Sequence, residues 1–178
     1  MANTTFSGAV RSENGFEVVS KNSSTGAVTT SFTYDGSGMQ VAPVTLSDAD
    51  TSITAATHGG RVVVVPAIGS NRTLTLPSPA EGVSFKFIYG GAAEEAENLI
   101  IDTGADANYF IGGVVHLDSN ADNVSVYANG SSNSILTLTD FGLMEINIVA
   151  KDSTNWIIWG YTEGADAPAF TDQSQLTR

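Results

Sequence analysis

The chain has 178 residues, which predicts a single domain large enough to bury a hydrophobic core, with room for an arm or a tail. Its formal net charge is −12, and its 7 Lys and Arg residues are spread singly along the sequence. Because phosphate binding needs clustered positive charge, we expect no nucleic-acid partner. Cysteine is absent, which excludes disulfides and thiolate chemistry and fits assembly in a reducing cytoplasm.

The composition favours short strands and many turns. Charged residues make up 15% of the chain, and Thr, Ser, Asn and Gly fill the deficit. The residues Met1–Phe6 contain no basic or long apolar segment, so we expect no signal peptide. No apolar run approaches the roughly 20 residues of a membrane helix, and we expect no membrane partner.

Residues 1–34 are expected to form an extended N-terminal arm together with the first strands. Apolar side chains are sparse at its start, where Phe6, Val10 and Phe16 stand among small polar residues beside Arg11. Such an arm can add a strand to the sheet edge of a neighbouring chain. Phe6, Val10, Arg11 and Phe16 are therefore the candidate residues of an interface with a neighbouring subunit, and a frayed terminus is the alternative.

The core is expected between residues 35 and 161. Its strongest pattern predicts a β-hairpin, in which Arg61–Val65 and Thr73–Leu76 flank a turn. A second hairpin is predicted from Asn123–Tyr127 and Ile135–Leu138, and its apolar positions repeat those of the first. Two similar halves are what two Greek keys would give, although two unrelated hairpins could match as well.

Alternating polar and apolar residues predict the remaining strands. These are Phe16–Ser20, Val28–Tyr34, Val41–Leu46, Val83–Tyr89, Asn98–Asp102, Tyr109–Ile111, Val114–Leu117, Leu143–Val149 and Trp156–Tyr161. Many short strands at this spacing predict an all-β fold, specifically an antiparallel β-sandwich or jelly-roll-like domain with an extended N-terminal arm. Residues 162–178 are expected to form a C-terminal tail, mobile or docked on a partner.

Three patterns suggest chemistry, and each has a structural alternative. The run Leu99–Asp106 resembles the Asp-Thr-Gly loop of retroviral-type aspartic proteases, which needs a second carboxylate from another copy, but Asp-Thr-Gly after a strand is also an ordinary turn. Asp118, Asn120 and Asp122 have the spacing that opens a Ca²⁺ loop, yet Asn123 and Asn129 stand where that loop wants Gly and Glu. A solvated turn is the alternative, and we expect no cofactor.

The aromatic and imidazole side chains near the predicted strands are also ambiguous. Trp156, Trp159 and Tyr161 could form a sugar-binding platform, but alternation along one strand should turn at least one Trp into the core. His58 and His116 have no metal-ligand or catalytic spacing around them, and His116 in an apolar run is expected to be structural. The sequence therefore predicts no enzyme.

Several segments together resemble a small β-domain that recurs in structural proteins of tailed bacteriophages. They are Leu74–Pro77, Gly82–Ile88 and Asp152–Trp159, and the opening residues Met1–Phe6 and Arg11–Phe16 look like the start of virion proteins from marine bacteriophages. The resemblance covers most of the chain and transfers no catalytic residue.

The resemblance implies a capsid decoration (cement) protein. Such a protein is typically a homotrimer that binds the major capsid protein and stabilises the outer surface of the virion head. The acidic charge agrees with a place outside the DNA-lined interior. A receptor- or glycan-binding module of a phage tail or head fibre is the alternative function.

Overall fold

The structure is a computed structural model that describes residues 15–35 and 38–173. It is mostly β, with 50% strand and 3% helix, which confirms the all-β prediction. The chain divides into two compact units, Met1–Ala42 and Pro43–Arg178. The boundary expected from the sequence lies between residues 34 and 35.

The first unit is a three-stranded antiparallel sheet in the order β1-β2-β3. Its strands are β1 (Phe16–Lys21), β2 (Val28–Asp35) and β3 (Gly38–Gln40). Between β1 and β2, the Asn22 side chain accepts hydrogen bonds from the backbone N–H groups of Ser24 and Thr25, and Gly26 takes a positive φ of 73°. This turn chemistry closes the hairpin, so both strands expected here are confirmed.

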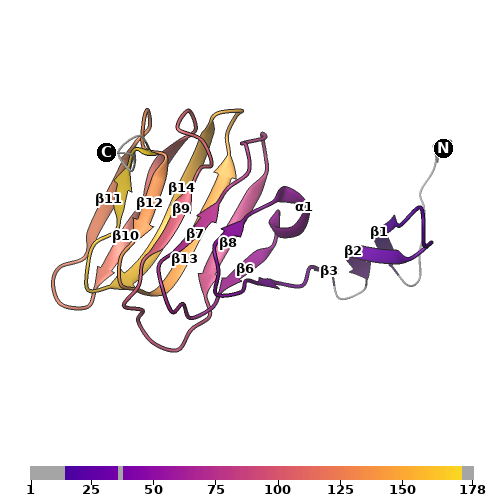
Figure 1. Cartoon of the computed structure of the whole chain (residues 1–178), viewed down its shortest axis with the longest axis horizontal. Helices are drawn as coiled ribbons and strands as arrows, with labels where there is room; N and C mark the ends of the chain where they lie inside the picture. Colours follow the sequence, from indigo (N-terminus) through magenta and orange to yellow (C-terminus); the bar gives the residue numbers. More distant parts are fainter. Residues whose placement is uncertain (1–14, 36–37, 174–178) are drawn as a thin grey trace. The chain divides into compact units, whose positions relative to one another are not determined.

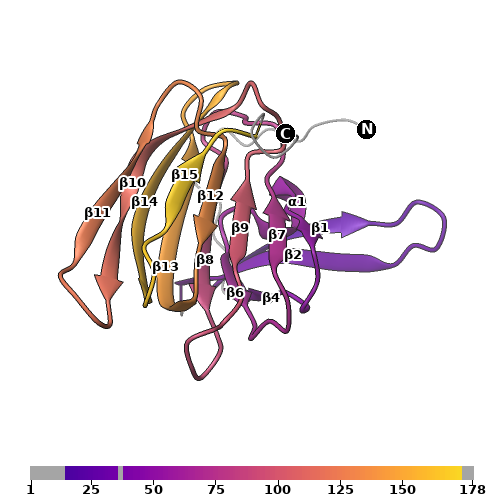
Figure 2. The same ribbon diagram turned by 60° about the vertical axis from the view of Figure 1, so that its left-hand side comes forward.

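The second unit contains two sheets that lie in adjacent layers (Figures 1 and 2). The seven-stranded sheet has the order β11-β10-β14-β13-β8-β6-β4, and the five-stranded sheet has the order β15-β12-β9-β7-β5. The strands are β4 (Val44–Thr45), β5 (Thr51–Ser52), β6 (Val62–Val65), β7 (Arg72–Thr75), β8 (Ser84–Tyr89), β9 (Leu99–Asp102), β10 (Tyr109–Asp118), β11 (Val124–Asn129), β12 (Ile135–Leu138), β13 (Phe141–Ala150), β14 (Asn155–Gly164) and β15 (Ala169–Thr171).

The first hairpin expected from the sequence is wrong, because its two strands belong to different sheets. From β4 to β9 the chain changes sheet at every turn, so that β6 pairs in parallel with β4 and β8, and β7 pairs in parallel with β5 and β9. Pro66 ends β6, and Ile68 in the following turn is buried. The apolar sides of β6 and β7 therefore face each other across the core instead of lying side by side.

The second expected hairpin is wrong for the same reason. The strand β11 pairs with β10 in the seven-stranded sheet, whereas β12 pairs with β9 and β15 in the five-stranded sheet. The hairpins of the second unit are β10–β11 and β13–β14. Both predicted hairpins are thus crossings between the sheets.

Both sheets of the second unit are mixed, which corrects the expectation of an antiparallel sandwich. Parallel pairs join β4 to β6, β6 to β8, β5 to β7, β7 to β9 and β10 to β14. Antiparallel pairs join β13 to both β8 and β14, β11 to β10, and β12 to both β9 and β15. The two-sheet character agrees with the prediction, while the parallel neighbours differ from the order that Greek keys would give.

Helix is confined to one turn in the described part of the chain. The helix α1 (Ala55–His58) begins after Thr54, whose hydroxyl accepts a hydrogen bond from the Thr57 N–H. Residues 92–97 form a loop. Among the described residues, no helix is long and apolar enough to cross a bilayer.

The core lies between the two sheets and follows the predicted alternation. Phe85 and Phe87 point inward from β8, and Met144, Ile146 and Ile148 point inward from β13. The largest buried side chain is Trp156, which is 0% exposed and packs against Phe85 with ring centroids 5.8 Å apart. Trp156 is therefore the inward-facing tryptophan that the sequence required.

Two segments that the sequence analysis left outside strands are parts of strands in the structure: the Gly112-Gly113 pair and the residues that follow 161. The Gly112-Gly113 pair lies inside one continuous strand, β10, where Gly112 has a φ of 110° and a Cβ there would lie 2.2 Å from the Ile158 carbonyl oxygen. Only glycine fits that approach. Beyond residue 161, β14 continues to Gly164 and β15 pairs with β12, so that Phe170 contacts Phe110.

Replacing Trp156 by Ala should lower the free energy of unfolding by about 3–5 kcal/mol, because it leaves a large cavity in the core. Trp159→Ala is the matched control, since Trp159 lies on the same strand and is 49% exposed. Its effect should stay within about 1 kcal/mol. Urea unfolding of the two variants measures both values, and equal losses would contradict the assigned faces of β14.

Candidate binding surface

The outer face of the seven-stranded sheet carries rows of side chains set by strand register. Residues paired across neighbouring strands share a face of the sheet. One row reads Tyr127, Gly113, Trp159, Asn147 and Lys86 across β11, β10, β14, β13 and β8. The next row reads Ser125, Val115, Tyr161, Glu145 and Ile88.

The parts of these rows on β11, β10, β14 and β13 line an open hollow of about 780 Å³. Exposed apolar side chains dominate its lining, led by Tyr127, Leu143, Trp159 and Val115. A smaller hollow of about 270 Å³ adjoins it over β8 and β6 and shares Trp159 and Asn147 with the first. Monomeric proteins seldom expose such a group of large apolar side chains without using it.

Gly113 lines the hollow between Tyr127 and Trp159. A Cβ at Gly113 would lie 2.7 Å from Cδ1 of Tyr127 and 2.3 Å from the Val126 carbonyl oxygen. Any side chain at Gly113 would therefore displace the Tyr127 ring, which lies next to the backbone of β10.

A polar group lies beside the aromatic side chains. The Glu145 Oε1 atom is 2.9 Å from Lys86 Nζ and accepts a hydrogen bond of 3.1 Å from Asn147 Nδ2. The hydrogen bond from Lys86, followed by that from Asn147, lowers the pKa of Glu145 below its usual value. Glu145 is therefore a carboxylate at neutral pH, with its position fixed by two donors.

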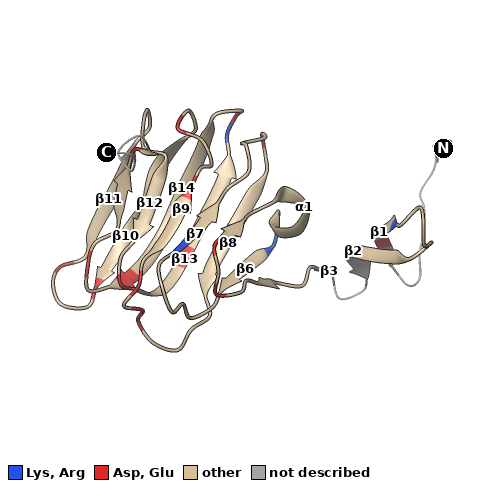
Figure 3. Ribbon diagram, in the orientation of Figure 1, with Lys and Arg blue, Asp and Glu red and all other residues tan. Residues whose placement is uncertain are grey.

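Acidic residues of the second unit lie mainly in loops and near strand ends (Figure 3). Glu145 is the exception in the middle of a strand, and it is paired with Lys86. The outer face therefore carries little net charge, although the whole chain has a formal charge of −12.

The candidate interface residues of the arm are placed only in part. Phe6, Val10 and Arg11 lie outside the described residues. Phe16 begins β1 and is 50% exposed, and Val18, Val19 and Val28 on the same sheet are comparably exposed. Every residue from Phe16 to Thr30 is exposed, so this part of the sheet has no buried face.

The candidate metal residues form the turn of the β10–β11 hairpin. Asp118 Oδ1 accepts hydrogen bonds from the backbone N–H groups of Asn120 and Ala121, and Asn123 Oδ1 accepts one from the Asp118 N–H. No group of three or more acidic or histidine side chains able to hold a metal ion occurs among the described residues. The geometry of this segment is that of the turn alternative.

Asp102 also acts in a turn. Its Oδ1 atom accepts the Gly104 N–H at 2.7 Å, and Gly104 has a φ of 80°. Gln173 Nε2 lies 3.3 Å and 3.1 Å from the two carboxylate oxygens. These partners match the turn alternative, and the second carboxylate of a protease would have to come from another copy.

Both histidines are buried beside backbone groups. His58 Nδ1 accepts a hydrogen bond from the Thr54 N–H in the turn of α1. His116 Nε2 lies 2.9 Å from the Gly164 carbonyl oxygen, while its Nδ1 has no partner among the described residues. Each imidazole therefore holds a local backbone segment.

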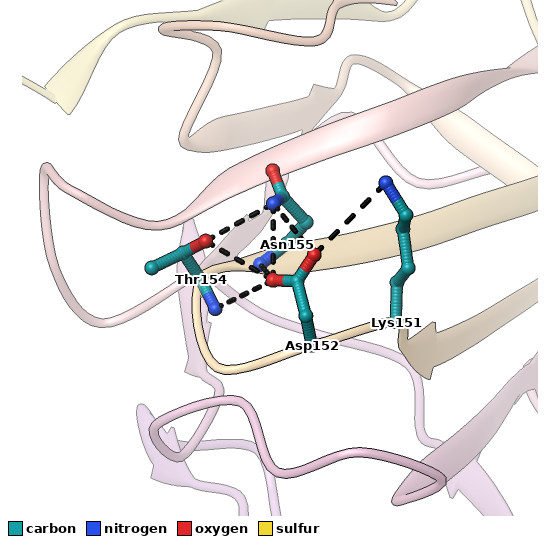
Figure 4. Close-up of polar contacts among 4 residues, drawn as sticks. All are labelled: Lys151, Asp152, Thr154 and Asn155. Carbon is teal, nitrogen blue, oxygen red and sulfur yellow. Dashed lines mark hydrogen bonds and ion pairs between the residues drawn. The ribbon is translucent and has the colours of Figure 1, made fainter.

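Asp152 closes the β13–β14 hairpin through a group of hydrogen bonds to Thr154 and Asn155 (Figure 4). Its Oδ1 atom accepts the backbone N–H groups of Thr154 and Asn155 and the side-chain donors of both residues. Lys151 Nζ stands 4.0 Å from the other carboxylate oxygen. The hydrogen bond from the Asn155 side chain, then that from the Thr154 N–H, lowers the pKa of Asp152 to about 2.

Sequence reasoning found part of the outer-face site and missed the rest. It named Trp159 and Tyr161 as a possible platform, and both lie on the outer face. It missed Tyr127, Glu145 and Asn147, because these residues reach the hollow only through strand pairings that join distant segments. The sequence offered one signal for this site, because Tyr127 is a large aromatic residue at the end of a predicted alternating strand.

Comparison with known proteins adds no assignment. No protein-family model matches the chain, and no curated protein matches it.

Replacing Asp152 by Asn should reduce the loss in the free energy of unfolding that occurs when the pH falls below about 4. Since the pKa is 3.8 in the unfolded chain and about 2 in the folded protein, the stabilisation is complete above pH 3.8 and is lost as the pH falls toward 2. Urea unfolding of wild type and D152N between pH 2 and pH 6 measures the difference. A difference that does not change with pH would contradict the role of this carboxylate.

Proposed function

We propose that the chain is a structural virion protein that decorates the outer surface of a tailed-phage head, binds the major capsid protein through its first unit and assembles as a homotrimer. The resemblance of its sequence to virion β-domains supports the virion assignment. The second unit supplies a two-sheet body with one continuous core, which suits a role in adhesion.

The observation that carries the proposal is the exposed three-stranded sheet. Phe16, Val18, Val19 and Val28 are between 48% and 60% exposed, and no residue from Phe16 to Thr30 is buried. A sheet of this size needs a covered hydrophobic face to be stable. These side chains therefore need a protein partner, which would bury them at roughly 25 cal/mol per Å² of apolar area.

Two features make a capsid subunit a suitable partner. The strands β1 and β3 are the edges of the sheet, and an edge offers backbone donors and acceptors for a strand of another protein. The copies of the chain in one trimer would also bind neighbouring capsid subunits at the same time. This raises the overall affinity without any new contact in each copy.

The charge of the chain supports an outer location. With a formal net charge of −12, it would be repelled by packaged DNA. The acidic loops would also keep decorated particles apart in solution.

Replacing Phe16 by Ala should weaken binding to capsid shells about tenfold. The substitution removes a large aromatic side chain from the proposed interface, and such side chains often carry much of the binding free energy. Co-sedimentation with shells of the major capsid protein from the same phage genome measures the affinity. Trp159→Ala is the matched control, with an equally exposed large side chain on the second unit, and should bind as wild type.

The proposal fails if wild-type protein does not sediment with the shells, or if Phe16→Ala and the double variant Phe16→Ala/Val18→Ala bind as wild type does. Light scattering of the free protein checks the trimer separately.

A further inference from the structure

We propose that the outer face of the seven-stranded sheet binds a neutral glycan, with Trp159 as the stacking platform and Glu145 and Asn147 as hydroxyl partners. This inference goes beyond capsid binding, which rests on the first unit. It gives the protein a second surface with a ligand of different chemistry.

The aromatic part of the site is suited to a pyranose ring. A pyranose presents an apolar C–H face, which packs against an aromatic ring, and a rim of hydroxyl groups. Trp159 is 49% exposed and lies on β14, between β10 and β13, so its backbone is held on both sides. Tyr161 lies two residues further along the same face, and Tyr127 lies across Gly113. Trp159 and Tyr127 are exposed and Tyr161 is half-buried, so a ligand can reach the rings without any rearrangement of the core.

The polar part of the site offers acceptors and donors in fixed positions. Glu145 uses Oε1 for Lys86 and Asn147, while its Oε2 has no hydrogen-bond partner within residues 15–35 and 38–173. Asn147 donates through Nδ2, which leaves its Oδ1 atom available as an acceptor. Lys86 retains further N–H donors, and its side chain is 40% exposed. Sugar hydroxyls, which donate and accept at once, match this set.

The shape of the site fits an oligosaccharide. The main hollow, of about 780 Å³, is within the range of small-molecule pockets, and it is open to solvent. The smaller hollow shares Trp159 and Asn147 with it and continues toward Val62 on β6. Sugar units could therefore follow one another across the strands.

The charges of the site favour a neutral ligand. Lys86 is already paired with Glu145, and Glu163 stands on the same strand as Trp159 and Tyr161. An anionic sugar would meet these carboxylates and a protein of formal charge −12. A second protein would instead bury the Lys86–Glu145 pair, at a desolvation cost that sugar hydroxyls reduce by hydrogen bonding.

The test uses the full-length protein on an array of neutral oligosaccharides: maltohexaose, cellohexaose, laminarihexaose, chitohexaose and β1,4-galactohexaose. We expect at least one of them to bind, with the affinity then measured by titration calorimetry. Trp159→Ala should weaken that binding about tenfold or more, and Trp159→Phe, which keeps a ring, should weaken it less.

Phe16→Ala is the matched control, because Phe16 is 50% exposed and lies on the other unit. It should keep glycan binding while its capsid binding is weakened about tenfold, and Trp159→Ala should show the reverse. Thermal unfolding of each variant confirms that it is folded. This crossed design separates the failure of the glycan site from the failure of the proposed capsid function.

A blank array with folded wild-type protein overturns the inference. It is also overturned if Trp159→Ala binds the sugar as wild type does. If Trp159→Ala leaves the array unchanged but lowers the molar mass measured by light scattering, the face is an interface between copies of this chain and the glycan assignment is wrong.

Discussion

The change of sheet at each turn between β4 and β9 is the constraint on which the rest of the second unit depends. Because consecutive strands lie opposite each other, the inward side chains of both sheets meet in one core, and pairing within each sheet joins segments far apart in sequence. The antiparallel pair β8–β13 then carries the seven-stranded sheet on to β14 and β10. The outer face with Trp159 is a consequence of this order, since it draws on strands from both halves of the unit.

Polar side chains near strand ends hold this arrangement in place. Asp118 and Asp152 close the two hairpins of the second unit, and each accepts backbone N–H groups in its own turn. Arg72 Nε lies 2.6 Å from Asp48, which connects the loop before β5 to the start of β7. Hydrogen bonding to Arg72 lowers the pKa of Asp48 below its usual value. Because most acidic residues lie in turns, the faces of the sheets are nearly uncharged. The charged loops and the apolar outer face are therefore different parts of the surface.

The two exposed apolar surfaces differ in chemistry. The three-stranded sheet offers Phe16 and its neighbours on strands with open edges and lacks a buried face between Phe16 and Thr30. The outer face with Trp159 lies on a body with a complete core and contains the fixed Lys86–Glu145 pair. A surface without a buried face of its own is suited to permanent assembly. A preformed surface with available acceptors is suited to reversible binding, and this difference is why we propose different ligands for the two surfaces.

The sequence by itself determined most of the strands, because alternation depends on neighbouring residues alone, but it missed the short strands β3, β5 and β15. It placed at least one of Trp156 and Trp159 in the core, and the alternation along β8 and β13 matches the side chains that are buried there. It also gave the turn alternative for Asp102, since an Asp-Thr-Gly turn is local. Only the tertiary structure decided which strands pair. A hairpin and a crossing between sheets share the same period-2 pattern, so both predicted hairpins were wrong, and the meeting of Glu145 with Lys86 and Trp159 followed from backbone pairing over long sequence distances.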